Sequence, residues 1–182
     1  RRFKIKYIEK AKEPPAMDLL CGDSIHKAME AVNKTIDALA FSGSEDRATE
    51  IAVGAFNDCL KVKENEFRKA ESERETRSRW DAKQSFDTWS LYGPKLLEAY
   101  FKTRGAAPFG PALEHYSDGA PFVERLEQIE LGNDIFWSKI DLYTSQRVIV
   151  DYKTTSKKPS DWDVQRFAHS IQFKAYAWAV WK

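Results

Sequence analysis

The first half of the chain carries apolar residues at helical spacing. One set recurs at intervals of four, three, four and three residues: Ile25, Met29, Val32, Ile36 and Leu39. This spacing places the set on one face of a helix and predicts a helix over residues 24–41. Residues 45–80 and 86–102 are predicted to form two further helices. Residues 1–16 are expected to form a helical or extended lead-in that ends at two prolines.

The period of the pattern changes in the second half of the chain. There it predicts three strands, over residues 122–131, 135–143 and 148–153. The plausible turns between them are Asn133-Asp134 and Ser145-Gln146. Ser160 or Asp161 is expected to cap a last helix that runs to the end of the chain.

This order of elements, helices followed by a β-meander and a closing helix, predicts an α/β fold. We expect one domain over residues 1–182, with an N-terminal helical lobe over residues 1–105 and the meander with its closing helix over residues 121–182. A chain of 182 residues is long enough to bury a substantial core. Because the chain does not begin with methionine, we expect it to be a fragment of a longer protein.

Composition and charge narrow the function only a little. No apolar run approaches the roughly 18 residues that span a bilayer, and no signal peptide is evident. The net charge of +1 neither requires nor excludes a nucleic-acid partner. Cys21 and Cys59 have no CxxC spacing, which argues against a disulfide framework or a zinc site and favours a reduced, cytoplasmic compartment.

The candidate chemistry lies in the segment Ile149-Val150-Asp151-Tyr152-Lys153-Thr154. Side chains alternate between the faces of a strand, so Asp151 and Lys153 are expected to point one way and Tyr152 the other. A carboxylate holds a hard divalent cation, and an ammonium group beside it orients water or stabilises a phosphate. If the strands form a hairpin, Asp141 converges on Asp151, which is the skeleton of a metal-dependent phosphodiesterase site. The two carboxylates repel each other until a cation binds.

Five motifs in a fixed order point to a known family. They are Gly22-x-x-x-His26, Val123-Glu124, Ile140-Asp141, Asp151-Tyr152-Lys153-Thr154 and Gln172-x-x-x-Tyr176. Together they resemble the PD-(D/E)xK nuclease superfamily, and within it the branch that contains the RecB nuclease domain, the AddB-type nucleases and the Cas4 exonucleases. The resemblance covers nearly the whole chain. It implies a restriction-endonuclease-like fold, in which a mixed β-sheet is flanked by helices.

The resemblance also implies a role for each matched residue. The ligands of a Mg²⁺ or Mn²⁺ ion would be His26, Asp141, Asp151 and the backbone carbonyl of Tyr152. An imidazole ligand shifts the preference toward Mn²⁺. Lys153 would position the attacking water or stabilise charge on the phosphate. Glu124 would lie at the edge of the site, and Gln172 and Tyr176, one helical turn apart, would orient the catalytic lysine or contact the DNA backbone.

Several members of this branch carry an iron–sulfur cluster held by four cysteines. The two cysteines present here, Cys21 and Cys59, do not provide four ligands, so the residues present support no cluster.

Ordinary structural roles remain open for the same residues. His26 is also compatible with a histidine at the edge of the core, and Asp141 with a cap of the turn at Ser145. Asp151 and Lys153 would form an unremarkable surface ion pair in a protein without a site. Gln172 and Tyr176 are equally compatible with routine boundary positions.

The expected function is that of a metal-dependent DNA exonuclease or end-processing nuclease, acting on single-stranded DNA or DNA ends in recombination, repair or phage- or CRISPR-type processing, in a bacterial host. The charged stretch Lys61 to Arg79 and the Lys157-Lys158 loop are candidate contacts to the DNA backbone, although the ordinary interpretation of that stretch is a solvated helix face. Two alternatives stay open: a nuclease-like DNA-binding or scaffolding module, and a restriction-type endonuclease.

Overall fold

The computed structural model describes residues 17–35, 44–72, 86–114, 118–154 and 160–181. The expectations for residues 1–16, for the chain beyond residue 72 in the second helix, and for Lys157-Lys158 lie outside these residues.

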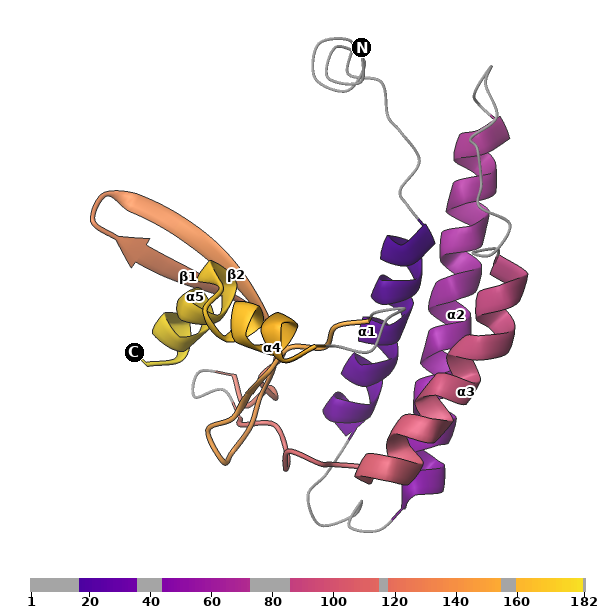
Figure 1. Ribbon diagram of the computed structural model, residues 1–182, viewed down its shortest axis with the longest axis horizontal. Coiled ribbons are helices and arrows are strands. Elements are labelled where there is room, and N and C mark those ends of the chain that lie inside the picture. The colour runs from indigo at the N-terminus through magenta and orange to yellow at the C-terminus, as the bar shows by residue number, and fades with distance from the viewer. Residues whose placement is uncertain (1–16, 36–43, 73–85, 115–117, 155–159, 182) are drawn as a thin grey trace.

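Three helices lie side by side and form the helical lobe (Figure 1). They are α1 (Met17–Thr35), α2 (Glu45–Ser72) and α3 (Phe86–Arg104). The apolar stripe predicted for the first helix is confirmed at Ile25, Met29 and Val32, which are buried in the core of this lobe. Its continuation at Ile36 and Leu39, and the predicted helix end at residue 41, lie outside the described residues. The start predicted at residue 24 was wrong. Ser24 is buried inside α1 and donates its hydroxyl to the Leu20 carbonyl, because the same buried face extends one turn further back.

Gly93 allows α3 to pack closely against α2. A Cβ atom at this position would overlap the ring of Phe56, which is completely buried. The contact therefore fixes how near the two helices come to each other.

The three predicted strands form an antiparallel sheet in the order β1-β2-β3. They are β1 (Val123–Leu131), β2 (Asp134–Tyr143) and β3 (Ile149–Val150). The first turn lies one residue earlier than predicted, at Gly132-Asn133, because Gly132 adopts the positive φ of 64° that opens a tight hairpin. The turn predicted at Ser145-Gln146 is confirmed. β3 is shorter than predicted, since its ladder to β2 ends at Val150.

The closing segment contains two helices where one was predicted. They are α4 (Asp161–Ala168) and α5 (Ile171–Val180). Ser160 caps α4 in a capping box with Asp163, as expected for this serine. The helix is interrupted because Ser170 caps a new one, with its hydroxyl accepting from the amide of Phe173 at 3.2 Å.

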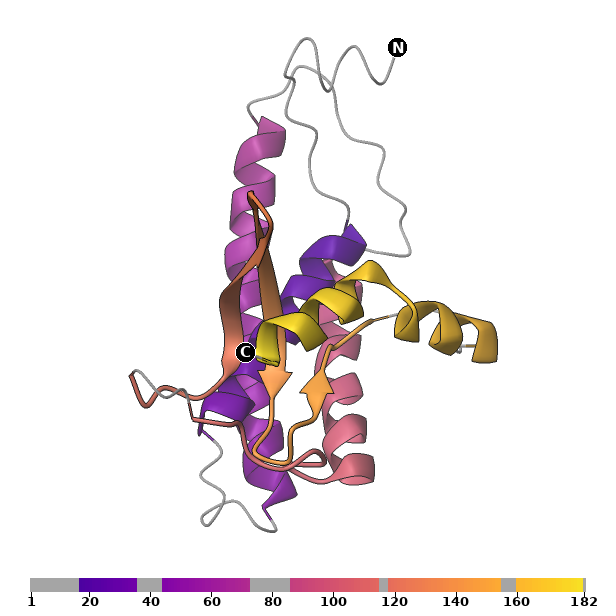
Figure 2. The same cartoon turned by 90° about the vertical axis from the view of Figure 1, so that its left-hand side faces the viewer.

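The hairpin of β1 and β2 connects the two parts of the molecule. α5 packs on one of its faces, where Tyr176 and Ala179 bury Ile129 and Ile140. Its near end contacts α1, and its turn points away from the helical lobe (Figure 1 and Figure 2). This arrangement confirms an α/β fold with helices flanking a sheet and is consistent with the restriction-endonuclease-like fold. None of the described helices has both the length and the apolar composition needed to cross a membrane.

We expect Gly93→Ala to lower the free energy of unfolding by about 1–3 kcal/mol, because the added methyl group overpacks the interface with Phe56. Gly54→Ala in α2 is the matched control. Nothing lies within 4 Å of a Cβ atom at Gly54, so this variant should gain up to about 1 kcal/mol from helix propensity. Urea unfolding of both proteins checks the contrast, and equal effects would contradict the close packing.

Candidate active site

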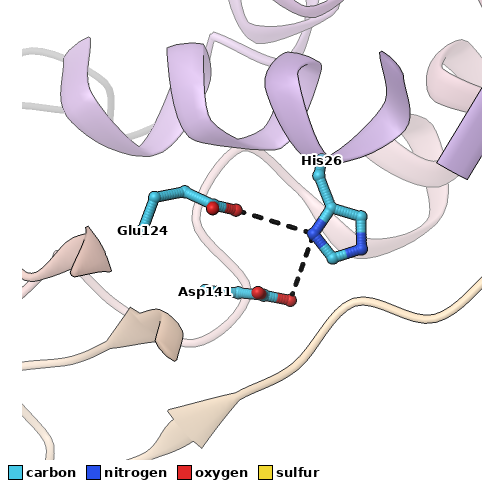
Figure 3. A group of neighbouring side chains, drawn as sticks. All are labelled: His26, Glu124 and Asp141. Atoms are coloured by element: carbon cyan, nitrogen blue, oxygen red, sulfur yellow. Dashed lines mark ion pairs between the residues drawn. The ribbon is translucent and has the colours of Figure 1, made fainter. Parts of the chain in front are cut away.

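Three side chains from three different elements converge at the junction of the helical lobe and the sheet. His26 comes from α1, Glu124 from β1 and Asp141 from β2 (Figure 3). His26 Nδ1 lies 3.5 Å from Glu124 Oε1 and 3.5 Å from Asp141 Oδ2. One ligand atom from each residue lies within 4.8 Å of the others, which is a separation that a single metal ion can bridge.

The sheet register explains why the two acids meet. Val123 pairs with Leu142 and Arg125 pairs with Ile140, so Glu124 and Asp141 occupy opposing positions between these pairs. Glu124 has a φ of 53°, a left-handed conformation that is uncommon for a residue with a side chain. Such conformations cost free energy and persist where the surrounding structure imposes them, often at functional sites.

The two acids are nearly inaccessible, with side chains 8% and 7% exposed, and cations offset their charge. Hydrogen bonds to Asp141 and then to Glu124 raise the pKa of His26 to about 10, so the imidazole is protonated at neutral pH when no metal is bound. Burial alone would raise the pKa of Glu124. His26 and Lys139, which forms an ion pair with Glu124, outweigh that effect and hold the pKa below its usual range.

Asp151 lies next to this group and has its own set of partners. Its Oδ1 atom accepts hydrogen bonds from Lys153 Nζ at 3.0 Å, Gln172 Nε2 at 3.2 Å and the Tyr176 hydroxyl at 3.2 Å. Its Oδ2 atom is buried and has no hydrogen bond, although Lys153 Nζ lies 2.9 Å away as an ion-pair partner. Lys153 is therefore the cation that balances this buried oxygen in the metal-free protein.

The alternation predicted for the Asp151-Tyr152-Lys153 segment is confirmed. Lys153 and Asp151 contact each other, whereas the Tyr152 hydroxyl accepts from Asn33 Nδ2 at 3.1 Å, on the helical lobe. The amide of Tyr152 donates to Asp141 Oδ2 at 2.7 Å. This bond extends the contact between β2 and the β3 segment beyond Val150, where the strand ladder ends.

A cavity of about 420 Å³ opens beside the site, and His26, Glu124, Tyr152 and Lys153 are among the residues that line it. Four lysines from both parts of the molecule line it, together with three acids: Lys27, Lys63, Lys139 and Lys153, and Asp23, Glu30 and Glu124. Each of these lysines forms an ion pair with a carboxylate. Lys63 belongs to the charged stretch of the second predicted helix. Lys139 was not among the residues singled out from the sequence, yet it lies two positions before Asp141 on the same strand, so alternation alone places both side chains on one face.

The structure brings most of the predicted residues together but groups them differently. Glu124, predicted at the edge, belongs to the tightest cluster with His26 and Asp141, whereas Asp151 stands beside that cluster. Gln172 and Tyr176 contact Asp151, and so they reach Lys153 only through this carboxylate. The alternative role of Asp141 as a cap of the Ser145 turn does not apply, because its carboxylate accepts from Tyr152 instead.

Comparison with known families identifies the superfamily of the chain. Residues 1–182 match the model of the PD-(D/E)XK nuclease superfamily. The chain belongs to this superfamily. The comparisons with curated proteins and with solved structures gave no match.

Membership in the PD-(D/E)XK superfamily indicates a metal-dependent nuclease and implies DNA as the substrate. The donors of this nuclease fit a divalent cation, since the cluster offers one imidazole and two carboxylates. In the described part of the chain both cysteines are free thiols, Cys21 buried and Cys59 partly exposed.

We expect Asp141→Asn to weaken Mn²⁺ binding by at least about tenfold to a hundredfold, the cost of losing even a supporting partner of a metal site. The reason is that the substitution removes one negative charge from the cluster with His26 and Glu124. Calorimetric titration with Mn²⁺ measures the change. Asp134→Asn, at the exposed start of the same strand, is the control and should bind as the wild type does. Equal affinities for both variants would contradict this site.

The metal-free nuclease should lose stability as the pH rises. The folded-state pKa of His26, about 10, lies above its ordinary value of 6.5, so the protonated imidazole stabilises the fold fully below about pH 6.5. That contribution, at most about 5 kcal/mol and smaller because the imidazole is 29% exposed, is lost as the pH approaches 10. Urea unfolding in EDTA across this range measures the loss, and His26→Gln should remove it.

The control for this pH dependence is His169→Gln, which changes an exposed histidine at the end of α4. This variant should keep the wild-type pH dependence. A His26→Gln protein that still loses the same stability between these pH values would show that another group is responsible.

Proposed function

We propose that this chain is a metal-dependent exonuclease or end-processing nuclease that hydrolyses phosphodiester bonds of single-stranded DNA or DNA ends, in the service of recombination, repair or phage- or CRISPR-type DNA processing. The RecB-, AddB- and Cas4-like branch is the part of the superfamily that its motifs resemble. The observation that carries the proposal is the position of Lys153, which pairs with Asp151 and lines the same cavity as His26 and Glu124 of the cluster.

The metal ligands of this proposal come from both parts of the molecule. His26 and Asp141 would hold a Mg²⁺ or Mn²⁺ ion together with Glu124, the third member of their cluster. Asp151 is the further proposed ligand, carried over from the resemblance to the superfamily. The backbone carbonyl of Tyr152 is the remaining proposed ligand. When bound, such an ion supplies Lewis acidity to the phosphodiester and lowers the pKa of water.

Lys153 is the proposed catalytic cation. Its ammonium group lies 2.9 Å from Asp151 Oδ2 and is exposed to the cavity, where it can orient a water molecule and neutralise charge on the phosphate. Gln172 and Tyr176 have a positioning role in this proposal. By donating to Asp151 Oδ1, they fix the carboxylate that in turn holds Lys153.

The lining of the cavity supports a polyanionic substrate. Lys27 and Lys63 approach from the helical lobe, while Lys139 and Lys153 approach from the sheet. Lysines on two sides neutralise phosphates on both sides of a scissile bond. The cavity lies in the angle between α1 and the sheet, which favours a single strand or a free end over a duplex read through its grooves.

We expect Lys153→Ala to lower the rate of DNA cleavage by about a hundredfold to a thousandfold, the usual cost of removing a group that stabilises developing charge. The test uses end-labelled single- and double-stranded DNA, linear and closed circular, with Mg²⁺, Mn²⁺ or EDTA. Lys102→Ala is the matched control, because Lys102 is an exposed lysine paired with Glu98 on α3 and lies away from the cavity.

Each pattern of products has a separate meaning. Metal-dependent loss of linear DNA alone supports the exonuclease, and the product ladder gives its polarity. Cleavage of closed circles would contradict the exonuclease and favour a restriction-type endonuclease. Binding of DNA without cleavage or metal affinity would replace it with a scaffolding module.

A further inference from the structure

The face of the β1–β2 hairpin that carries the site continues outward as an exposed apolar strip. We call this the outer strip, and it consists of Leu126, Ile135 and Trp137. Their exposed fractions are 58%, 58% and 61%. Large apolar side chains gathered on one face of a sheet, and this accessible, commonly mark a binding surface.

Strand geometry places the outer strip and the site on one face. Asp141, Lys139, Trp137 and Ile135 alternate along β2, so all four side chains project to the same side. This is the side that faces the cavity, because Lys139 pairs with Glu124 and lines the cavity. On β1, Gln128 pairs with Trp137 and Glu130 pairs with Ile135, which puts Leu126 diagonally next to Trp137.

The opposite face of the hairpin already has a partner. Ile129 and Ile140 are 2% and 0% exposed there, because Tyr176 and Ala179 of α5 cover them. The outer strip therefore lies on the face of the hairpin that α5 does not cover. It lies on the part of the hairpin that projects away from the helical lobe (Figure 1).

We propose that the outer strip binds single-stranded DNA by base stacking, with Trp137 as the stacking platform. This inference rests on the proposed function and names the path of its substrate. Trp137 lies four residues from Asp141 along β2, which is about 13–14 Å in a strand and on the order of two nucleotides of an extended single strand. An indole ring stacks on any base, so the surface would be indifferent to sequence.

Charge favours DNA as the occupant over another apolar surface. Lys139 lies between Trp137 and Asp141 on the same face, and it joins the outer strip to the lysines of the cavity. A strand leaving the site would therefore meet an ammonium group and then an aromatic ring, the combination typical of single-strand binding. Glu130, beside Ile135, is acidic, so we expect the path to end near Trp137.

The test measures binding of a short fluorescein-labelled oligothymidylate to the full chain, with Ca²⁺ in place of Mg²⁺ to keep the strand intact. Trp137→Ala should raise the dissociation constant about tenfold to a hundredfold, and Trp137→Phe, which keeps a stacking ring, should change it by less than about threefold. An oligonucleotide with abasic sites should bind the wild type more weakly and bind Trp137→Ala without further loss.

Phe136→Ala is the matched control. Phe136 is the neighbour of Trp137 in β2 and is 51% exposed, but its side chain lies on the opposite face, in register with Ile129. This variant should bind as the wild type does. Thermal unfolding of both alanine variants establishes that the hairpin is intact, since each removed side chain is mostly exposed.

The outcomes separate this inference from the proposed function. Cleavage by the wild type with unchanged binding by Trp137→Ala overturns the stacking surface alone. Binding that depends on Trp137, without metal-dependent cleavage, supports the surface and overturns the nuclease. No binding of single strands by the wild type overturns the stacking surface as well. Light scattering tests a second occupant of the outer strip. A wild-type dimer that Trp137→Ala dissociates would assign the strip to a second copy of the chain and overturn the stacking proposal.

Discussion

The site depends on one carboxylate oxygen, Asp141 Oδ2. It accepts the amide hydrogen of Tyr152 at 2.7 Å and lies 3.5 Å from the imidazole of His26. The first contact holds the Asp151-Tyr152-Lys153 segment against β2 after the strand ladder has ended, and the second joins the sheet to the helical lobe. Asp141 Oδ2 is therefore the atom at which the Tyr152 backbone, the sheet and α1 meet, and the His26–Glu124 and Asn33–Tyr152 contacts reinforce the same junction.

The buried carboxylates around this oxygen repel one another, and nearby cationic side chains offset that repulsion. Glu124, Asp141 and Asp151 are mostly buried and close together, an arrangement that is unfavourable without cations. In the metal-free protein, protonated His26 and the amines of Lys139 and Lys153 supply the positive charge. A bound cation would supply the same compensation in place of the proton on His26.

Local patterns in the sequence predicted the elements and part of the site. The buried stripe of α1 and the alternation of Asp151, Tyr152 and Lys153 follow from the helix and strand periods, which are properties of the backbone. The convergence of Glu124 with His26 could not be predicted in this way, because it depends on strand register and on a left-handed backbone at Glu124. The break between α4 and α5 was missed because one serine between two helical segments is a weak sequence signal. In the structure Ser170 caps α5 and ends the continuity of the helix.

The donors of the site are spread over much of the chain, from His26 in α1 to Lys153 after β3 and Tyr176 in α5. During synthesis the histidine leaves the ribosome long before the lysine and the groups that hold its carboxylate. A nascent or truncated chain therefore carries single ligands but no assembled centre. On the proposed roles, the site is therefore complete only after α5 has packed on the sheet and brought Tyr176 to Asp151.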